Sequence, residues 1–339
     1  MRSFLVPLLI AAAPLGPPAI AAEWGDDTRA FTSGYERSKA ICRSAKSARL
    51  PEVAAVAAPD CDAEALYYGI GRKADPVTAH ACALRQAARQ APDADSPFEG
   101  RSLLMTIYAN GLGAPRDLDL AIALACRIDG APAEIDGRVL HLDRLRAEHW
   151  AGRDFDICDD LTSGYMMGLC ASHGARLEAA RRDADVARLT AAWPPQRKAA
   201  FAHLRTTADT YAEAVSENEV DPRGSGSGAF QVEAKAQQQS AFVGLLQQLA
   251  AGRSPDGTSS FADADAALNR AYGKLMKAKD DPDALPHGKD GIRRTQRAWL
   301  VYPDAFAAFA REAFPATDRD ALLAALTKAR TKALAAGAD

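Results

Sequence analysis

The chain has 339 residues, with 41 lysines and arginines against 44 aspartates and glutamates, and a formal net charge of −3. This balance argues against a nucleic-acid-binding surface, which needs a dense basic face. Alanine and charged residues dominate and runs of β-branched residues are scarce, a composition typical of helices. We therefore expect an all-α protein built from helical hairpins.

The N-terminus has the pattern of a signal peptide. Arg2 precedes an apolar run through Ile10, and residues 19–21 (Ala-Ile-Ala) give the small-x-small pattern of a cleavage site. Pro14 argues against the alternative of a buried N-terminal helix. We expect residues 1–21 to be removed and the mature protein to be periplasmic or secreted. No later apolar run approaches the ~20 residues that a membrane span needs, so no span is expected.

Six cysteines lie in the first half of the expected mature chain. They are Cys42, Cys61, Cys82, Cys126, Cys158 and Cys170. An even number in an oxidising compartment predicts three disulfides, although the sequence leaves about 15 possible pairings. We expect Cys158–Cys170 to be one pair, because a helix that begins at Ser163 would let Cys158 fold back towards Cys170. Zinc is disfavoured because only Cys170 and His173 have a spacing close to that of paired ligands, and neither a metal nor a cofactor is expected.

Residues 61–126 contain an internal repeat. Equivalent positions lie 42 residues apart, pairing Gly71 with Gly113, Asp75 with Asp117, and Ala79 with Ala121. Each copy predicts a helix end, a glycine turn and a new helix, which Asp117 can cap in the second copy. Helix–turn–helix units at a fixed period are typical of a solenoid.

The second copy reads Y-A-N-G-L-G-A-P-R-D-x-x-x-A over residues 108–121. This string resembles the Sel-like repeat of the tetratricopeptide superfamily. The resemblance implies a Sel-like helical repeat region over residues 22–152 that serves as a binding scaffold. The alternative is that two hairpins simply cap the domain that follows.

Residues 153–255 predict three helices. Thr162 or Ser163 can cap the first, which runs to about residue 189 and is stopped by the prolines at 194 and 195. The second has its apolar face between residues 201 and 215. The third runs from residue 230 to about residue 250, after a glycine–serine spacer.

Residues 256–339 also predict three helices. The first two cover residues 261–279 and 292–314, and Asp318 can cap the last. We expect the first two to pack as an antiparallel hairpin, with Asp281-Pro282 and Pro286-His287-Gly288 forming the hinge.

The first two of these helices carry an unusual polar motif on their apolar faces. It reads D-x-x-L-N-x-x-Y followed by Q-R-A-W-L-x-Y-x-D, at Asp265, Leu268, Asn269, Tyr272, Gln296, Trp299, Tyr302 and Asp304. This motif resembles the LprI-like lysozyme-inhibitor family of secreted bacterial proteins. Residues 153–255 resemble a more divergent LprI-like unit.

The motif has two alternative uses. Its amide, carboxylate, indole and phenol groups could form a preorganised binding site, or a hydrogen-bonded clasp between the two helices. We favour the clasp, because buried polar networks commonly specify a unique core. The family pattern has an arginine where this chain has Pro303. The proline predicts a kink because it cannot bond the carbonyl of Trp299.

The sequence lacks two motifs of familiar hydrolases, since neither G-x-S-x-G nor H-E-x-x-H occurs in it. The resemblance implies a non-enzymatic binding protein whose partner is a protein of the cell envelope, with lysozyme as the partner that the family suggests. The alternative is an envelope scaffold or assembly factor that binds another protein through its Sel-like repeats. No nucleic-acid partner is expected.

Overall fold

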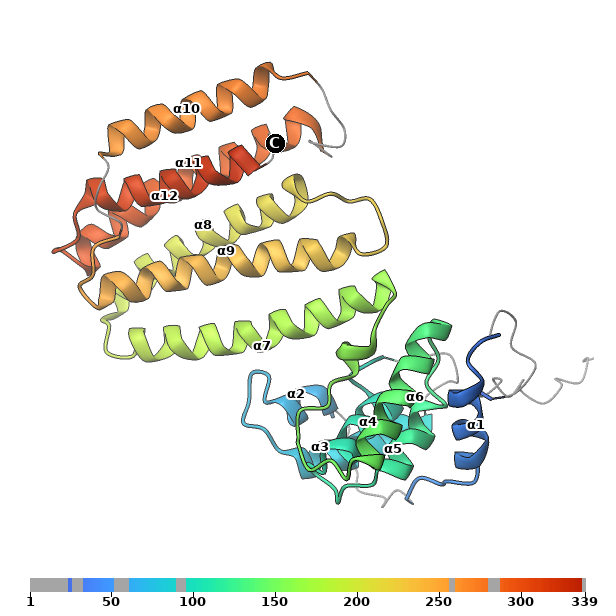
Figure 1. Cartoon of the computed structure of the whole chain (residues 1–339). Coiled ribbons are helices and arrows are strands. Elements are labelled where there is room, and N and C mark those ends of the chain that lie inside the picture. Colours follow the sequence, from blue (N-terminus) through green and yellow to red (C-terminus); the bar gives the residue numbers. More distant parts are fainter. Residues whose placement is uncertain are drawn as a thin grey trace, which may run out of the picture.

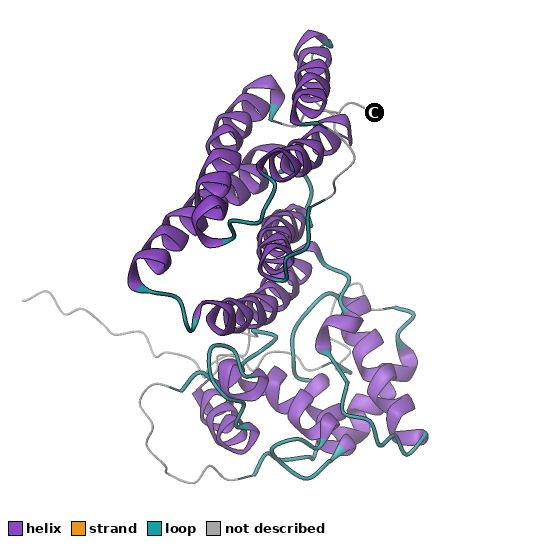
Figure 2. Ribbon diagram, turned by 90° about the vertical axis from the view of Figure 1, so that its left-hand side faces the viewer, coloured by secondary structure: helices purple, strands orange, loops and turns teal. Residues whose placement is uncertain are grey.

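A computed structural model describes residues 24–25, 33–51, 61–89, 96–255, 260–279 and 287–336. Every regular element in these ranges is a helix, as Figure 2 shows, and the prediction of an all-α fold is confirmed. The expected signal peptide, residues 1–21, lies outside the described residues.

The helices fall into two groups along the chain (Figure 1). The helices of the first group are short: α1 (Glu36–Ala45), α2 (Ala63–Tyr68), α3 (Pro76–Arg89), α4 (Gly100–Asn110), α5 (Leu118–Ala125) and α6 (Pro132–Ala147). A 3-10 turn, η1 (Ile157–Asp160), connects it to the second group. The helices of the second group are longer: α7 (Gly164–Thr190), α8 (Pro195–Glu219), α9 (Ser227–Ala250), α10 (Phe261–Lys277), α11 (Gly288–Ala313) and α12 (Arg319–Ala336).

The predicted internal repeat has the same backbone hydrogen bonds in both copies. The N–H of Asp75 donates to the carbonyl of Leu66 at 2.8 Å, and the N–H of Asp117 donates to that of Tyr108 at 3.0 Å. Both pairs of equivalent residues lie 42 positions apart. The 42-residue period is therefore a structural repeat that joins α2 to α3 and α4 to α5.

Gly113 shows why the second turn needs glycine. Its φ is +96°, which side-chain-bearing residues rarely adopt. A Cβ placed there would lie 2.3 Å from the carbonyl oxygen of Pro76. The absence of a side chain thus allows the second turn to pack against the beginning of α3.

Two disulfides lie within the first group, and a third joins η1 to α7 of the second group. They join Cys42 to Cys126, Cys61 to Cys82, and Cys158 to Cys170, with Cα–Cα distances of 5.6, 5.9 and 5.9 Å. The predicted Cys158–Cys170 pair is confirmed. Ser163 is the N-cap of α7 and accepts a hydrogen bond from the N–H of Met166, which places Cys170 two turns into the helix.

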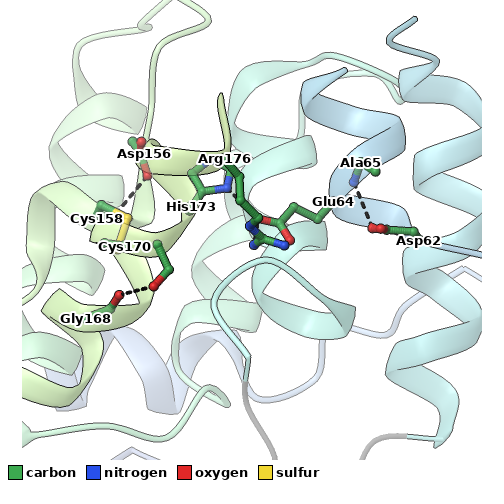
Figure 3. Close-up of polar contacts among 10 residues, drawn as sticks. Asp62, Glu64, Ala65, Asp156, Cys158, Gly168, Cys170, His173 and Arg176 are labelled. Atoms are coloured by element: carbon green, nitrogen blue, oxygen red, sulfur yellow. Dashed lines mark hydrogen bonds and ion pairs between the residues drawn. A yellow bond between two sulfur atoms is a disulfide. The ribbon is translucent and has the colours of Figure 1, made fainter. Parts of the chain in front are cut away.

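The connection between the two groups is held by buried carboxylates. On α2, Glu64 accepts hydrogen bonds from two side chains of α7, namely Nδ1 of His173 at 2.5 Å and the guanidinium of Arg176 (Figure 3). Phe98 stacks on the His173 ring with a centroid distance of 3.9 Å. These contacts hold the first turns of α7 against the N-terminal helices.

Glu134 fixes the segment that leads into α7. Its carboxylate accepts the backbone N–H of Thr162 at 2.8 Å and that of Ser163. Burial alone raises the pKa of Glu134, but these backbone donors outweigh it and hold the pKa below its ordinary value. The ionised carboxylate is therefore the form that fits this position.

The long helices repeat one arrangement. In the set α7–α9, the third helix packs against the first and the second, and the set α10–α12 is built the same way. The two second helices, α8 and α11, pack against each other and join the sets around a shared apolar core (Figure 1). They run antiparallel, because Phe201 near the start of α8 lies beside Phe309 near the end of α11.

The prediction that α10 and α11 pack directly as a hairpin is wrong. The main contact of α10 is with α12, and the main contact of α11 is with α8. The reason is that α12 is apolar on several sides, since residues 321–324 (Ala-Leu-Leu-Ala) are all buried. A helix of this kind can pack between two neighbours. The helix α11 also continues past Pro303, whose ring is buried.

Candidate functional site

A groove runs between α9 and α12 and is the main candidate for a binding site. Its cavity volume is about 570 Å³. Helices α9 and α12 form its walls, and α8 and α11 form its floor. The lining residues are Ala208, Tyr211, Gln237, Gln238, Ala241, Phe242, Leu245, Trp299, Tyr302, Ala325, Leu326, Ala329, Arg330, Lys332 and Ala333. We call this the α9–α12 groove.

Aromatic rings make up the floor. Tyr211 of α8 stacks on Tyr302 of α11, with ring centroids 5.7 Å apart and planes inclined by 20°. Trp299 lies one turn before Tyr302, and each of these two side chains is only 6% exposed. Burial raises the pKa of Tyr302 and of Tyr211, so both phenols stay neutral at physiological pH. The aromatic part of the floor is therefore buried and uncharged.

Arg330 of α12 also lines the groove and is 1% exposed. Its guanidinium makes a bidentate ion pair with Glu219 at 2.6 and 2.9 Å, and its Nε donates to the side-chain oxygen of Gln296 at 3.0 Å. Burial alone lowers the pKa of Arg330, but Glu219 raises it, so the charged form is the one present. Its charge is compensated within the protein.

The walls carry small and polar side chains. Ala325, Ala329 and Ala333 repeat every fourth residue along α12, and so face the groove together. On the opposite wall, Gln237 places an amide at the surface. Lys332 is exposed at the rim. These groups offer apolar contact, hydrogen bonds and positive charge at the surface of the groove.

The structure brings together part of the predicted motif. Trp299 and Tyr302 lie in the floor of the groove, and the side-chain oxygen of Gln296 accepts a hydrogen bond from the lining residue Arg330. Leu268 is buried in the shared core and Tyr272 packs against that core.

The remaining motif residues lie elsewhere. Asp265 and Asn269 are exposed on α10 and bond to each other at 2.9 Å, and Asp304 is exposed on α11. The expected clasp from Asp265 and Asn269 to Gln296 is therefore wrong. The physical reason is the packing order, since α12 rather than α11 is the main neighbour of α10. The polar partner of Gln296 comes from α12.

Sequence reasoning missed Arg330, Glu219 and Tyr211 as members of this site. Arg330 lies in the polar string Thr-Lys-Ala-Arg-Thr-Lys, which reads as a solvated helix face. A signal was present, however. Arg330 is four residues after Leu326 and four before Leu334, and this spacing places it on the buried face of the helix.

Neither a metal-ligand cluster nor a helix able to span a membrane is found among the described residues. No group of three or more histidine, cysteine or acidic side chains in those ranges is arranged to hold a metal ion. None of the helices described is both long and apolar enough to span a bilayer.

Comparison with known proteins links the last three helices to one family. The model of the family described as Lysozyme inhibitor LprI matches residues 257–334. The C-terminal segment is LprI-like. The match covers α10, α11 and most of α12, so it includes one wall and half the floor of the α9–α12 groove. No curated protein and no solved structure matches the chain.

Proposed function

We propose that this chain is a non-enzymatic protein-binding protein of the lysozyme-inhibitor type, and that it uses the α9–α12 groove to bind its partner. The observation that carries the proposal is the position of Trp299 and Tyr302. Both belong to the segment similar to the LprI family, and both form the floor of the groove. Concave, mostly apolar surfaces with a few polar groups are where proteins usually bind ligands.

We also propose that the protein acts in the periplasm or outside the cell, after removal of residues 1–21. The three disulfides support this location, because disulfides persist in oxidising compartments. The signal-peptide pattern of the first residues supports it independently.

For the domain organisation, we propose a Sel-like repeat region over residues 22–152, a divergent LprI-like unit over residues 153–255 and a second LprI-like unit over residues 256–339. The repeated packing of α7–α9 and α10–α12 supports two related helical units. The turns 42 residues apart support a repeat region.

The test is inhibition of lysozymes from several structural classes acting on purified peptidoglycan. We expect the wild-type protein to inhibit at least one class with a defined stoichiometry. Ala329→Trp fills the groove and should remove this inhibition. Ala308→Trp makes the same change on the exposed face of α11, away from the groove, and should leave it intact. Failure of the wild-type protein to inhibit any class would contradict the proposal.

A scaffold or assembly factor is the second candidate, favoured by the repeated turns of α2–α3 and α4–α5. It predicts that a partner captured from periplasm remains bound to Ala329→Trp. The lysozyme-inhibitor proposal predicts that the partner is lost from this variant and retained by Ala308→Trp.

A further inference from the structure

The length of the α9–α12 groove limits what it can accommodate. Its lining positions run from 237 to 245 on α9 and from 325 to 333 on α12, eight residue steps on each wall. At a rise of 1.5 Å per residue this is about 12 Å. An extended chain advances about 3.3 Å per residue, so about four residues span the groove.

The polar lining of the groove favours an extended chain over a helix. A helix satisfies most of its backbone N–H and C=O groups internally, whereas an extended segment needs outside partners for them.

The lining groups match the needs of an extended peptide. Backbone N–H and C=O groups of such a peptide require partners, and the side-chain amides of Gln237 and Gln238 offer both a donor and an acceptor. Alanines at 325, 329 and 333 leave room for the peptide along α12. The aromatic floor provides contact for apolar side chains.

Charge gives the peptide a chemical preference. The lining contains two cations, Arg330 and Lys332, and no aspartate or glutamate. Glu219 compensates Arg330, whereas Lys332 is exposed at the rim. A carboxylate of the bound segment is the complementary group at that rim.

We propose that the α9–α12 groove binds an extended segment of about four residues from a partner protein, with apolar side chains against Trp299 and Tyr302 and a carboxylate beside Lys332. The inference rests on the proposed function in one respect only, that the ligand of the groove is a protein. It adds the conformation and the charge of the bound segment.

The experiment is selection of a displayed library of random heptapeptides on the immobilised full-length chain. We expect enriched peptides to combine apolar residues with an aspartate or glutamate. An enriched peptide, synthesised with a fluorescent label, should bind Ala329→Trp at least about tenfold more weakly. Lys332→Glu should weaken it about three- to fivefold, as expected for an exposed ion pair. Lys277→Glu, an equal charge change on exposed α10, should have no effect.

Two controls keep the result interpretable. Unchanged helical circular dichroism and melting temperature show that each variant is folded. Absence of enrichment, or enriched peptides that bind wild type and Ala329→Trp equally, overturns the inference.

Different results would contradict the proposed function. If peptides select the groove but no lysozyme is inhibited, the lysozyme assignment is wrong and the peptide site stands. If lysozyme is inhibited equally by wild type and Ala329→Trp, the inhibitor assignment stands and the groove is not its site.

Discussion

Arg330 and Glu219 form a bidentate ion pair between the last helix and the end of α8, with N–O distances of 2.6 and 2.9 Å. The arginine side chain is fully buried, whereas the glutamate side chain is 14% exposed. The pair links the two sets of long helices at the groove that Arg330 lines. The net stabilisation from a buried ion pair is small, because both charges lose their hydration. Removing one partner is strongly destabilising, because it leaves the other charge buried without compensation.

The two single substitutions should therefore differ in cost. Glu219→Gln leaves a buried charged guanidinium without its counterion, and we expect a loss of about 3–5 kcal/mol of unfolding free energy. Arg330→Met leaves the carboxylate, which water can still reach, so its cost should be smaller. Urea unfolding of both variants measures the order. Equal losses below about 1 kcal/mol would show that the pair does not organise the core.

Trp299 should be a core residue as well as part of the groove floor. Because it is 6% exposed, Trp299→Ala should lower the unfolding free energy by about 3–5 kcal/mol. Its neighbour Leu300 is 57% exposed, so Leu300→Ala is the matched control and should change stability by less than about 0.5 kcal/mol. Similar small effects for both variants would mean that the indole is not an anchor of the fold.

Pro303 leaves the carbonyl of Trp299 without its usual helical donor. Pro303→Ala restores that N–H, and a proline in a helix interior is unfavourable by about 3 kcal/mol relative to alanine. Loss of the buried ring and the greater freedom of the unfolded chain offset part of the gain, so we expect a net stabilisation of about 1–2 kcal/mol. Pro303→Arg should gain less, because this position is buried. Thermal and urea unfolding of the two variants provide the comparison.

The sequence could predict most of the local structure because the signals are local. Ser163 and Asp117 each begin a helix by accepting a backbone N–H, as their residue types predict. The packing order of the last three helices could not be predicted, because apolar faces on α10 and α11 fit either each other or α12. Arg330 was missed for a related reason. A charged residue in a polar string is usually solvated, and only its distant partner Glu219 makes its burial tolerable.

We expect acid to weaken the connection between the two groups of helices that the Glu134 carboxylate stabilises. Its pKa is lowered in the folded protein, so its contribution to stability is fully present above the unfolded value of about 4.3 and is lost as the pH falls through the folded value. In Glu134→Gln this contribution is missing at every pH. The difference in unfolding free energy between wild type and variant should therefore be largest near pH 6 and shrink below about pH 4. A difference that does not change with pH would contradict this role of the carboxylate.

The three disulfides should differ in their contributions because they close loops of different length. Cys42–Cys126 spans 84 positions and Cys158–Cys170 spans 12. In the chain-entropy model the longer loop stabilises by about 4.5 kcal/mol and the shorter by about 3 kcal/mol. Replacing both cysteines of a pair by alanine should therefore cost more for Cys42/Cys126 than for Cys158/Cys170. Urea unfolding of the two double variants tests the order, and the reverse order would show that native contacts around η1 and α7 outweigh loop length.

Thiol labelling of denatured, unreduced protein should detect no free cysteine in the wild type. Four bonded cysteines should remain in each double variant. Six reactive thiols in exported protein would overturn the disulfide assignment itself.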